Sequence, residues 1–173
     1  MNQLRNFLFK VFFSVFVYLF IDNYLSKWSP LIAKVWNLMF HLALLPLVKV
    51  TTLALKINGY EVTTNYNILQ VAGTDGVYVN NAAIGVGFMF CFAVLILFYP
   101  GGDKRKKLWF IPLGVLAIFI SSVIRLYYLV SRDTTPGLYL IQEQHDSFSI
   151  AMFILIFILW FIWVRLVNKI SFN

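Results

Sequence analysis

Three short stretches carry polar residues that could do chemistry in an otherwise apolar chain. Arg125 lies near the end of one apolar run, and His145 with Asp146 comes just before another. Residues 80–85, Asn-Asn-Ala-Ala-Ile-Gly, lead from a polar segment into a third run. If these runs cross a bilayer as helices, all three stretches lie at the same membrane level. That shared level indicates a site better than any one of the residues does.

Each of these side chains also has an ordinary interpretation. An arginine in a membrane helix is costly unless it snorkels to the interface, pairs with an anion or serves a site. Arg125 is therefore either a snorkelling interfacial arginine or a site residue. His145 is either a solvated loop histidine or one whose protonated form is supported by Asp146 and Glu143.

The remaining reactive residue types indicate neither a metal site nor a disulfide. Cys91 is the single cysteine and the two histidines are far apart, so we expect no disulfide, metal or cofactor. Cys91 lies eight residues after Ala83, about 12 Å deeper along a helix at about 1.5 Å per residue. A thiol in hydrocarbon keeps its proton, so we interpret Cys91 as a packing residue.

The elements that must position these residues are membrane helices. The chain is 61% hydrophobic and 12% charged, against about 45–50% and 25% in soluble domains. We expect one all-α polytopic membrane domain over residues 1–173. Each predicted span suits a hydrocarbon core about 30 Å thick, and the spans cover residues 7–25, 84–100, 108–130 and 148–167. Ile21–Tyr24 offers no small-residue cleavage site, so we expect the first span to be an uncleaved anchor.

The basic residues predict how the chain is oriented. They flank the apolar runs, so membrane orientation accounts for the net charge of +7 better than a nucleic-acid partner does. With both termini and the loop 103–107 in the cytoplasm, the inner side holds eight of the fourteen basic residues and one of the seven acidic ones. We therefore expect a multi-pass protein of the plasma (inner) membrane whose site faces outward.

Residues 30–55 do not fit this count, because a single crossing there would put the loop 103–107 outside. Lys34, Asn37 and His41 recur at helical spacing, and Pro46 interrupts the run. We expect an amphipathic helix on the outer interface or a re-entrant hairpin. An additional span that faces a polar cavity is the alternative.

Residues 57–82 have a different character. Short β-branched and aromatic segments alternate with the turn signals Asn58-Gly59 and Asp75-Gly76. We expect a small outer β element of two or three strands, at residues 60–64, 66–71 and 77–79.

In order and spacing, these stretches resemble the exosortase and archaeosortase family of membrane-embedded cysteine transpeptidases and proteases. The stretches that match the family's motifs are Val79–Val86, Ser122-Val123-Ile124-Arg125-Leu126 and His145-Asp146, within roughly residues 50–168. Two positions depart from the family pattern. The nucleophilic cysteine falls on Ala83, and Ser122 replaces an asparagine. Either a substitution removed the cysteine, or the chain is a natural inactive relative.

The resemblance implies cleavage of a carboxyl-terminal sorting signal on a membrane-anchored protein at the outer membrane face. A cysteine at position 83 would attack the carbonyl, His145 would protonate the leaving amine and Arg125 would stabilise the oxyanion. Ser122, Asp146 and Asn81 would support them. The alternative is a non-enzymatic membrane assembly factor. A carrier is less favoured, because two spans have almost no polar residue at mid-depth.

Overall fold

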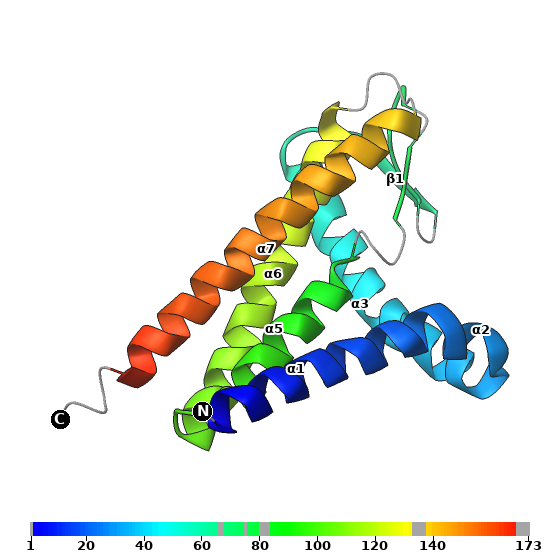
Figure 1. Ribbon diagram of the computed structural model, residues 1–173. Coiled ribbons are helices and arrows are strands. Elements are labelled where there is room, and N and C mark those ends of the chain that lie inside the picture. The colour runs from blue at the N-terminus through cyan, green and yellow to red at the C-terminus, as the bar shows by residue number, and fades with distance from the viewer. Residues whose placement is uncertain (1, 66–67, 75, 80–83, 133–137, 169–173) are drawn as a thin grey trace.

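The structure, a computed structural model, describes residues 2–65, 68–74, 76–79, 84–132 and 138–168. Long helices dominate it, with one small sheet at one end (Figure 1). The elements in chain order are α1 (Asn2–Phe20), the π-helical η1 (Ile21–Leu25), α2 (Ser26–Trp28), α3 (Pro30–Ile57), β1 (Val62–Asn65), β2 (Ile68–Val71), β3 (Val77–Tyr78), α5 (Val86–Phe98), α6 (Lys104–Arg132) and α7 (Leu138–Asn168).

Four helical stretches in the described part are long and apolar enough to cross a membrane. They are Gln3–Trp28, Pro30–Ile57, Lys104–Ser131 and Phe148–Val167. Helix α5 has 13 residues, which corresponds to about 20 Å and is short for a complete crossing. The predicted class, an all-α polytopic membrane protein with a small β element, is confirmed.

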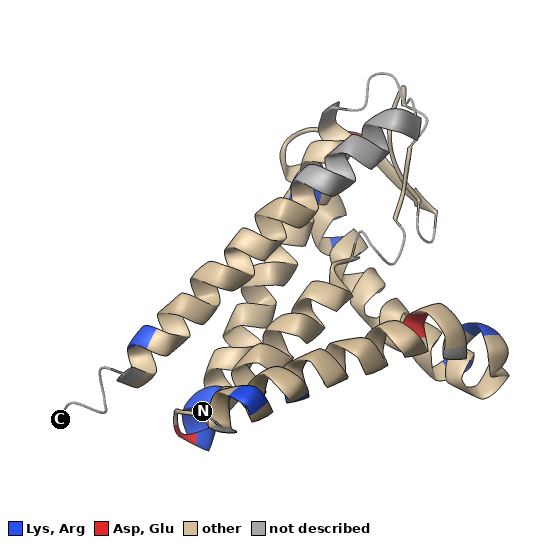
Figure 2. Cartoon of the chain, viewed as in Figure 1, with Lys and Arg blue, Asp and Glu red and all other residues tan. Residues whose placement is uncertain are grey.

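The helices define two ends of the molecule. At the end that we call the lysine end, α1, the α5–α6 loop and the last turns of α7 come together. There the Phe7 ring lies 5.8 Å from Tyr99, and Gly101 packs against Val167. At the opposite end, called the sheet end, the last turns of α3 and α6 meet β1–β3. Figure 2 shows basic residues gathered at the lysine end.

The lysine end is fixed by specific packing and capping contacts. The Lys107 ammonium donates to the carbonyl oxygens of Leu97 and Tyr99, at 3.0 and 2.7 Å. It thereby satisfies carbonyls that the end of α5 leaves without helical partners. Gly102 has φ +80°, and a Cβ there would stand 2.6 Å from Trp163, so the loop lies closely against α7.

The sheet is a three-stranded antiparallel meander in the order β1–β2–β3. Leu69 pairs with both Thr64 and Val77 and is fully buried. Gly59, at φ +84°, ends α3 and turns the chain toward β1. The predicted strands and the Asn58-Gly59 turn are confirmed, whereas Tyr66 and Asp75 lie outside the described residues.

Two buried clusters hold the helices together, and α6 contributes to both. The cluster toward the sheet end joins α3, the sheet and α6 through Leu47, Leu55, Leu69 and Leu126. The other joins α5, α6 and α7 through residues that include Phe92, Ile118 and Trp163. Helix α6 is therefore the element against which the others are positioned.

Two expectations about element boundaries are corrected. Residues 30–57 form one continuous helix that passes through Pro46, so the re-entrant hairpin is wrong. Membrane helices tolerate proline where neighbouring groups form hydrogen bonds with the backbone carbonyl that the proline leaves without a partner. Helix α7 begins at Leu138, so His145 lies within a helix and not in the loop expected for it.

Helix α3 joins the bundle through its second half. Its buried residues begin at Phe40 and continue to Leu55. Helix α1 and helix α3 meet at α2, on the side of the molecule away from α7 (Figure 1). Together they carry the chain from the lysine end to the sheet end.

Candidate functional site

Arg125 lies on α6 and points into the protein. Its guanidinium carbon is 4.1 Å from the centroid of the Phe148 ring on α7. Two of its three nitrogens, Nε and Nη1, are buried and have no hydrogen-bond partner in the part of the chain that the structure describes. The stacking accounts for a cation–π contribution of about 0.5–2 kcal/mol. Each unsatisfied buried donor costs about 1–3 kcal/mol, so two of them outweigh the stacking.

A close contact between helices lies one turn below Arg125. Ser122 is fully buried on α6 and donates to the carbonyl of Ile118 at 3.1 Å. Gly85, the residue that begins α5, has φ +76°, and a Cβ on it would stand 2.9 Å from Ser122 Oγ and 3.6 Å from Met152 Cε. Helices α5, α6 and α7 therefore approach one another here so closely that only a glycine fits at position 85.

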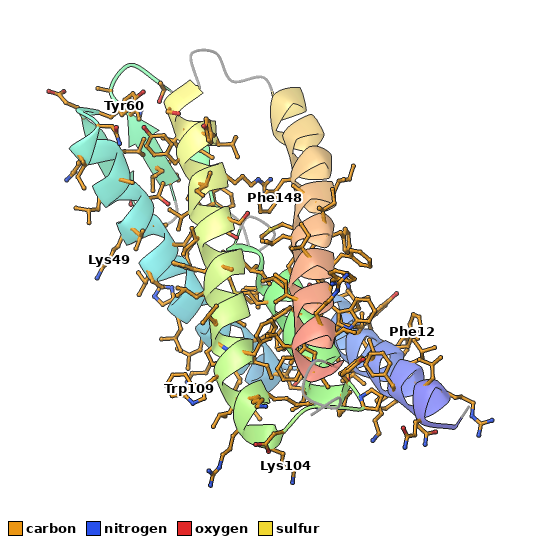
Figure 3. The ribbon with its side chains drawn as sticks, turned by 90° about the vertical axis from the view of Figure 1, so that its left-hand side faces the viewer. Phe12, Lys49, Tyr60, Lys104, Trp109 and Phe148 are labelled. Atoms are coloured by element: carbon orange, nitrogen blue, oxygen red, sulfur yellow. The ribbon has the colours of Figure 1, made fainter. Side chains whose placement is uncertain are left out.

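One aromatic ring stacks on the guanidinium from the α7 side, and a second ring packs against the first. Phe148 projects from α7 toward the sheet-end half of α6 (Figure 3). Phe88 of α5 meets it edge to face, with ring centroids 6.3 Å apart. These rings keep the surroundings of Arg125 apolar, and low polarity strengthens any interaction between the guanidinium and an anion.

The structure places part of the predicted site together. Arg125 and Ser122 lie one turn apart on α6, and Ser122 contacts Gly85, which follows Ala83 by two residues in the sequence. Ala83 and Asn81 themselves lie outside the described residues. That position 83, Arg125 and His145 share one site stays a prediction.

His145 and Asp146 are described through the path of their backbone only. Both lie in α7, and His145 precedes Phe148 by three residues, about one helical turn. The backbone of His145 is therefore one turn of α7 away from the ring on which Arg125 stacks.

Cys91 lies deeper in α5 than these residues. It comes six residues after Gly85, about 9 Å along the helix axis. It is a free thiol and is partly buried. Among the described residues no group of three His, Cys, Asp or Glu side chains could hold a metal ion.

Sequence reasoning did not find the ring on which Arg125 stacks, or the ring that packs against it. Phe148 and Phe88 are two of 18 phenylalanines in the chain, and no spacing signal distinguishes them. Two hollows were also missed. One, of ≈ 670 Å³, is entirely apolar and lies between the start of α1, α5 and α7, with Phe7, Leu95 and Trp160 among its lining residues. The other, at the lysine end, is described below.

The arrangement can bind an anion or stabilise developing negative charge. A guanidinium offers five donors in a fixed fork that suits a carboxylate or an oxyanion. Because Nε and Nη1 are unused within the described structure, an oxygen acceptor that approached either nitrogen would satisfy it. Protein-family models, curated proteins and solved structures yield no match to this chain.

Proposed function

We propose that this chain is an exosortase-like membrane protein whose site lies around Arg125 and receives the carboxyl-terminal sorting signal of a membrane-anchored protein. With Ala83 at the position of the family's nucleophile, the chain binds the signal and does not cleave it. The proposed setting is the plasma (inner) membrane, with the sheet end outside and both termini in the cytoplasm.

The proposal is carried by one observation, the buried guanidinium of Arg125 with Nε and Nη1 unpartnered in the described structure. Arg125 lies one turn from Ser122, which in turn contacts the glycine that begins α5. The resemblance puts the nucleophile two residues before that glycine and the histidine one turn before Phe148. A group that enters this space would meet donors suited to a carbonyl oxyanion.

With a cysteine at position 83, the proposed reaction is acyl transfer. The thiolate attacks the peptide carbonyl, a thioester forms, the C–N bond breaks and His145 gives a proton to the leaving amine. Water or a second amine then attacks the thioester and restores the thiol. Arg125 stabilises the oxyanion in both steps.

The first test restores the thiol and measures its reactivity. Ala83→Cys is made in a Cys91→Ala background, with Ala82→Cys in the same background as the matched control. The thiol at position 83 is expected to alkylate roughly tenfold faster at neutral pH, as thiols close to cations do. Arg125→Met should remove this advantage at position 83 and leave position 82 unchanged. Equal rates at the two positions would contradict the proposed site.

The second test concerns the substrate. Ala83→Cys should process a co-expressed protein that carries a sorting signal, and the Cys91→Ala change should not alter that processing. The chain with Ala83 should instead cross-link to the uncleaved signal, and Arg125→Met should reduce the yield. Processing that requires Cys91 and ignores position 83 would overturn the alignment. A folded Ala83→Cys protein with neither processing nor cross-linking would favour the non-enzymatic assembly factor, which the alanine at position 83 also fits.

A further inference from the structure

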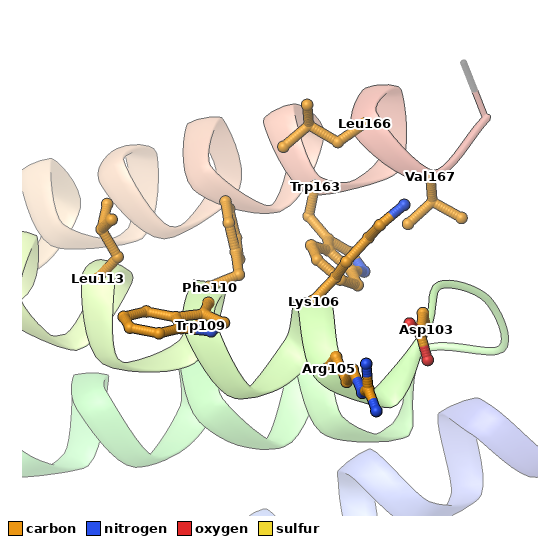
Figure 4. Close-up of a pocket in the computed structure, with 9 residues that line it drawn as sticks. All are labelled: Asp103, Arg105, Lys106, Trp109, Phe110, Leu113, Trp163, Leu166 and Val167. Atoms are coloured by element: carbon orange, nitrogen blue, oxygen red, sulfur yellow. The ribbon is translucent and has the colours of Figure 1, made fainter. Parts of the chain in front are cut away.

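A second feature that could bind a ligand lies at the lysine end, far along α6 from Arg125. A hollow of ≈ 500 Å³ opens between the first turns of α6 and the last turns of α7 (Figure 4). Its walls are apolar side chains from both helices: Trp109, Phe110, Leu113, Trp163 and Leu166. This volume falls within the range of about 300–1,000 Å³ that is usual for ligand sites.

The mouth of the hollow is basic. Arg105 and Lys106 lie at it with one carboxylate, Asp103, and all three side chains are exposed. Lys106 extends from α6 toward Val167 on α7 (Figure 4). The neighbouring Lys107 is engaged in capping α5, so Arg105 and Lys106 are the members of this basic run that are placed to hold an anion at the hollow.

The wall between the two helices contains an unused hydrogen-bond donor. Trp163 is 2% exposed, and its Nε1 has no hydrogen-bond partner within the described residues. Buried indole nitrogens usually donate to a partner. This nitrogen is closed off from the hollow, so the Trp163 ring lines the hollow with its carbon atoms.

The depth of the hollow matches one leaflet of a bilayer. Its lining on α6 runs from Arg105 at the mouth to Leu113, and eight residues of helix measure about 12 Å. A hydrocarbon core is about 30 Å thick, so the hollow reaches about as deep as an acyl chain does. Its basic mouth lies where the candidate span begins, at Lys104, which is where lipid headgroups lie.

We propose that this hollow binds one anionic phospholipid, with an acyl chain between α6 and α7 and the phosphate held by Arg105 and Lys106. Charge complementarity selects the headgroup, and the apolar walls require a lipid and not a free phosphate. The bound lipid joins α6 and α7 at the end opposite the Arg125 site.

The test is native mass spectrometry of the full chain titrated with phosphatidylglycerol or phosphatidylcholine of identical acyl chains. One phosphatidylglycerol should bind. Arg105→Gln with Lys106→Gln should weaken its binding by about twenty-five-fold, since each basic residue at an anionic surface contributes about fivefold. The matched control is Arg5→Gln with Lys104→Gln, which removes the same charge at the same end from residues that do not line the hollow. The control should retain most of the binding.

A second variant tests the apolar part separately. Leu113 is exposed, so the Leu113→Trp variant should fold. The larger side chain should fill the hollow and weaken the binding of both lipids. Trp163→Phe keeps an aromatic wall and removes a donor that the hollow does not reach, so it should leave the binding of phosphatidylglycerol nearly unchanged. Equal binding of the two lipids would overturn the proposal. So would an equal loss of phosphatidylglycerol binding in the Arg5→Gln, Lys104→Gln control, or displacement of the lipid by free glycerol phosphate.

Discussion

Arg125 is a residue that the fold keeps at a cost, and this can be measured. Arg125→Met removes the charge and the two unused donors and keeps a long apolar side chain beside Phe148. Because two unsatisfied donors cost more than one cation–π contact contributes, we expect the free energy of unfolding to rise by about 1 kcal/mol. Thermal unfolding in detergent would show it as a higher Tm.

Arg165 provides the matched control for this substitution. Its guanidinium carbon lies 4.9 Å from the Phe161 ring centroid, but the residue is exposed. Arg165→Met loses a similar stacking contact without relieving a buried donor, so it should leave the Tm unchanged or lower it slightly. A lower Tm for Arg125→Met than for Arg165→Met would mean that Arg125 is a structural residue and would remove the main support for the site.

The polar residues of the proposed site could be named from the sequence, whereas their surroundings could not. Arg125 could be identified as a candidate because a charge in an apolar run costs free energy unless it snorkels, pairs with an anion or serves a site. The same reasoning left a snorkelling arginine open, and only the stacking on Phe148 shows that the guanidinium turns inward. Phe148 could not be identified in advance, because its role depends on which helix faces α6 and not on its residue type.

The start of helix α5 makes a steric prediction about how α5 and α6 pack. Gly85→Ala puts a side chain at φ +76° and within 2.9 Å of Ser122 Oγ. The left-handed backbone costs about 1–2 kcal/mol and the contact adds to it, so we expect a loss of about 1–3 kcal/mol of stability. Adding Ser122→Ala should restore the part of the unfolding free energy that the steric contact removes. The part lost to backbone strain should remain. A double-mutant cycle of unfolding free energies would measure both parts.

Gly73 is the control for the backbone share. It has φ +85°, and a Cβ there would meet nothing within 4 Å. Gly73→Ala should cost the backbone strain alone, and Ser122→Ala should not change that cost. If Ser122→Ala relieved neither variant or both alike, the close contact between α5 and α6 at Gly85 would be contradicted.

Helix existence was predictable here, and helix boundaries were not. The apolar runs gave α6 and most of α7, because 18 or more apolar residues in succession suit a membrane helix. The start of α7 was placed ten residues late because residues 138–147 include Gln, Glu, His and Asp, which lower hydropathy without breaking a helix. Pro46 led to the wrong prediction of a break in residues 30–55. Proline breaks helices in water, but it is tolerated inside α3.

The proposed site lies where the two buried clusters meet on α6. Leu126 belongs to the cluster of α3 and the sheet, whereas Ile118 belongs to the cluster of α5 and α7. Ser122 and Arg125 come between them along the helix. A shift of α7 against α6 would therefore change the surroundings of Arg125 without unpacking the sheet. Lipid at the lysine-end hollow and substrate at Arg125 would both act on the α6–α7 pair.

The charge distribution predicts the topology of the whole molecule. Basic residues at the lysine end favour the cytoplasm, and α1 with α3 makes one net passage between the two ends. Single cysteines at positions 5, 61 and 105 in a Cys91→Ala background would be tested with a membrane-impermeant maleimide on intact cells. Position 61 should label from outside, and positions 5 and 105 only after the membrane is opened. Labelling of position 105 from outside would invert the orientation and put the Arg125 site at the wrong face for a secreted substrate.

A fourth cysteine, at position 27 in α2, decides which of the two amino-terminal helices makes that passage. The segment Gln3–Trp28 and the segment Pro30–Ile57 are both long enough, but the net count leaves room for one crossing. If α1 crosses and α3 lies along the outer interface, as expected from its polar positions Lys34 and Asn37, position 27 labels from outside together with position 61. Labelling only after the membrane is opened, together with position 5, would make α3 the crossing helix. Helix α1 would then lie along the inner interface. In that case Pro30–Ile57 would be the additional span that the sequence left open as the alternative.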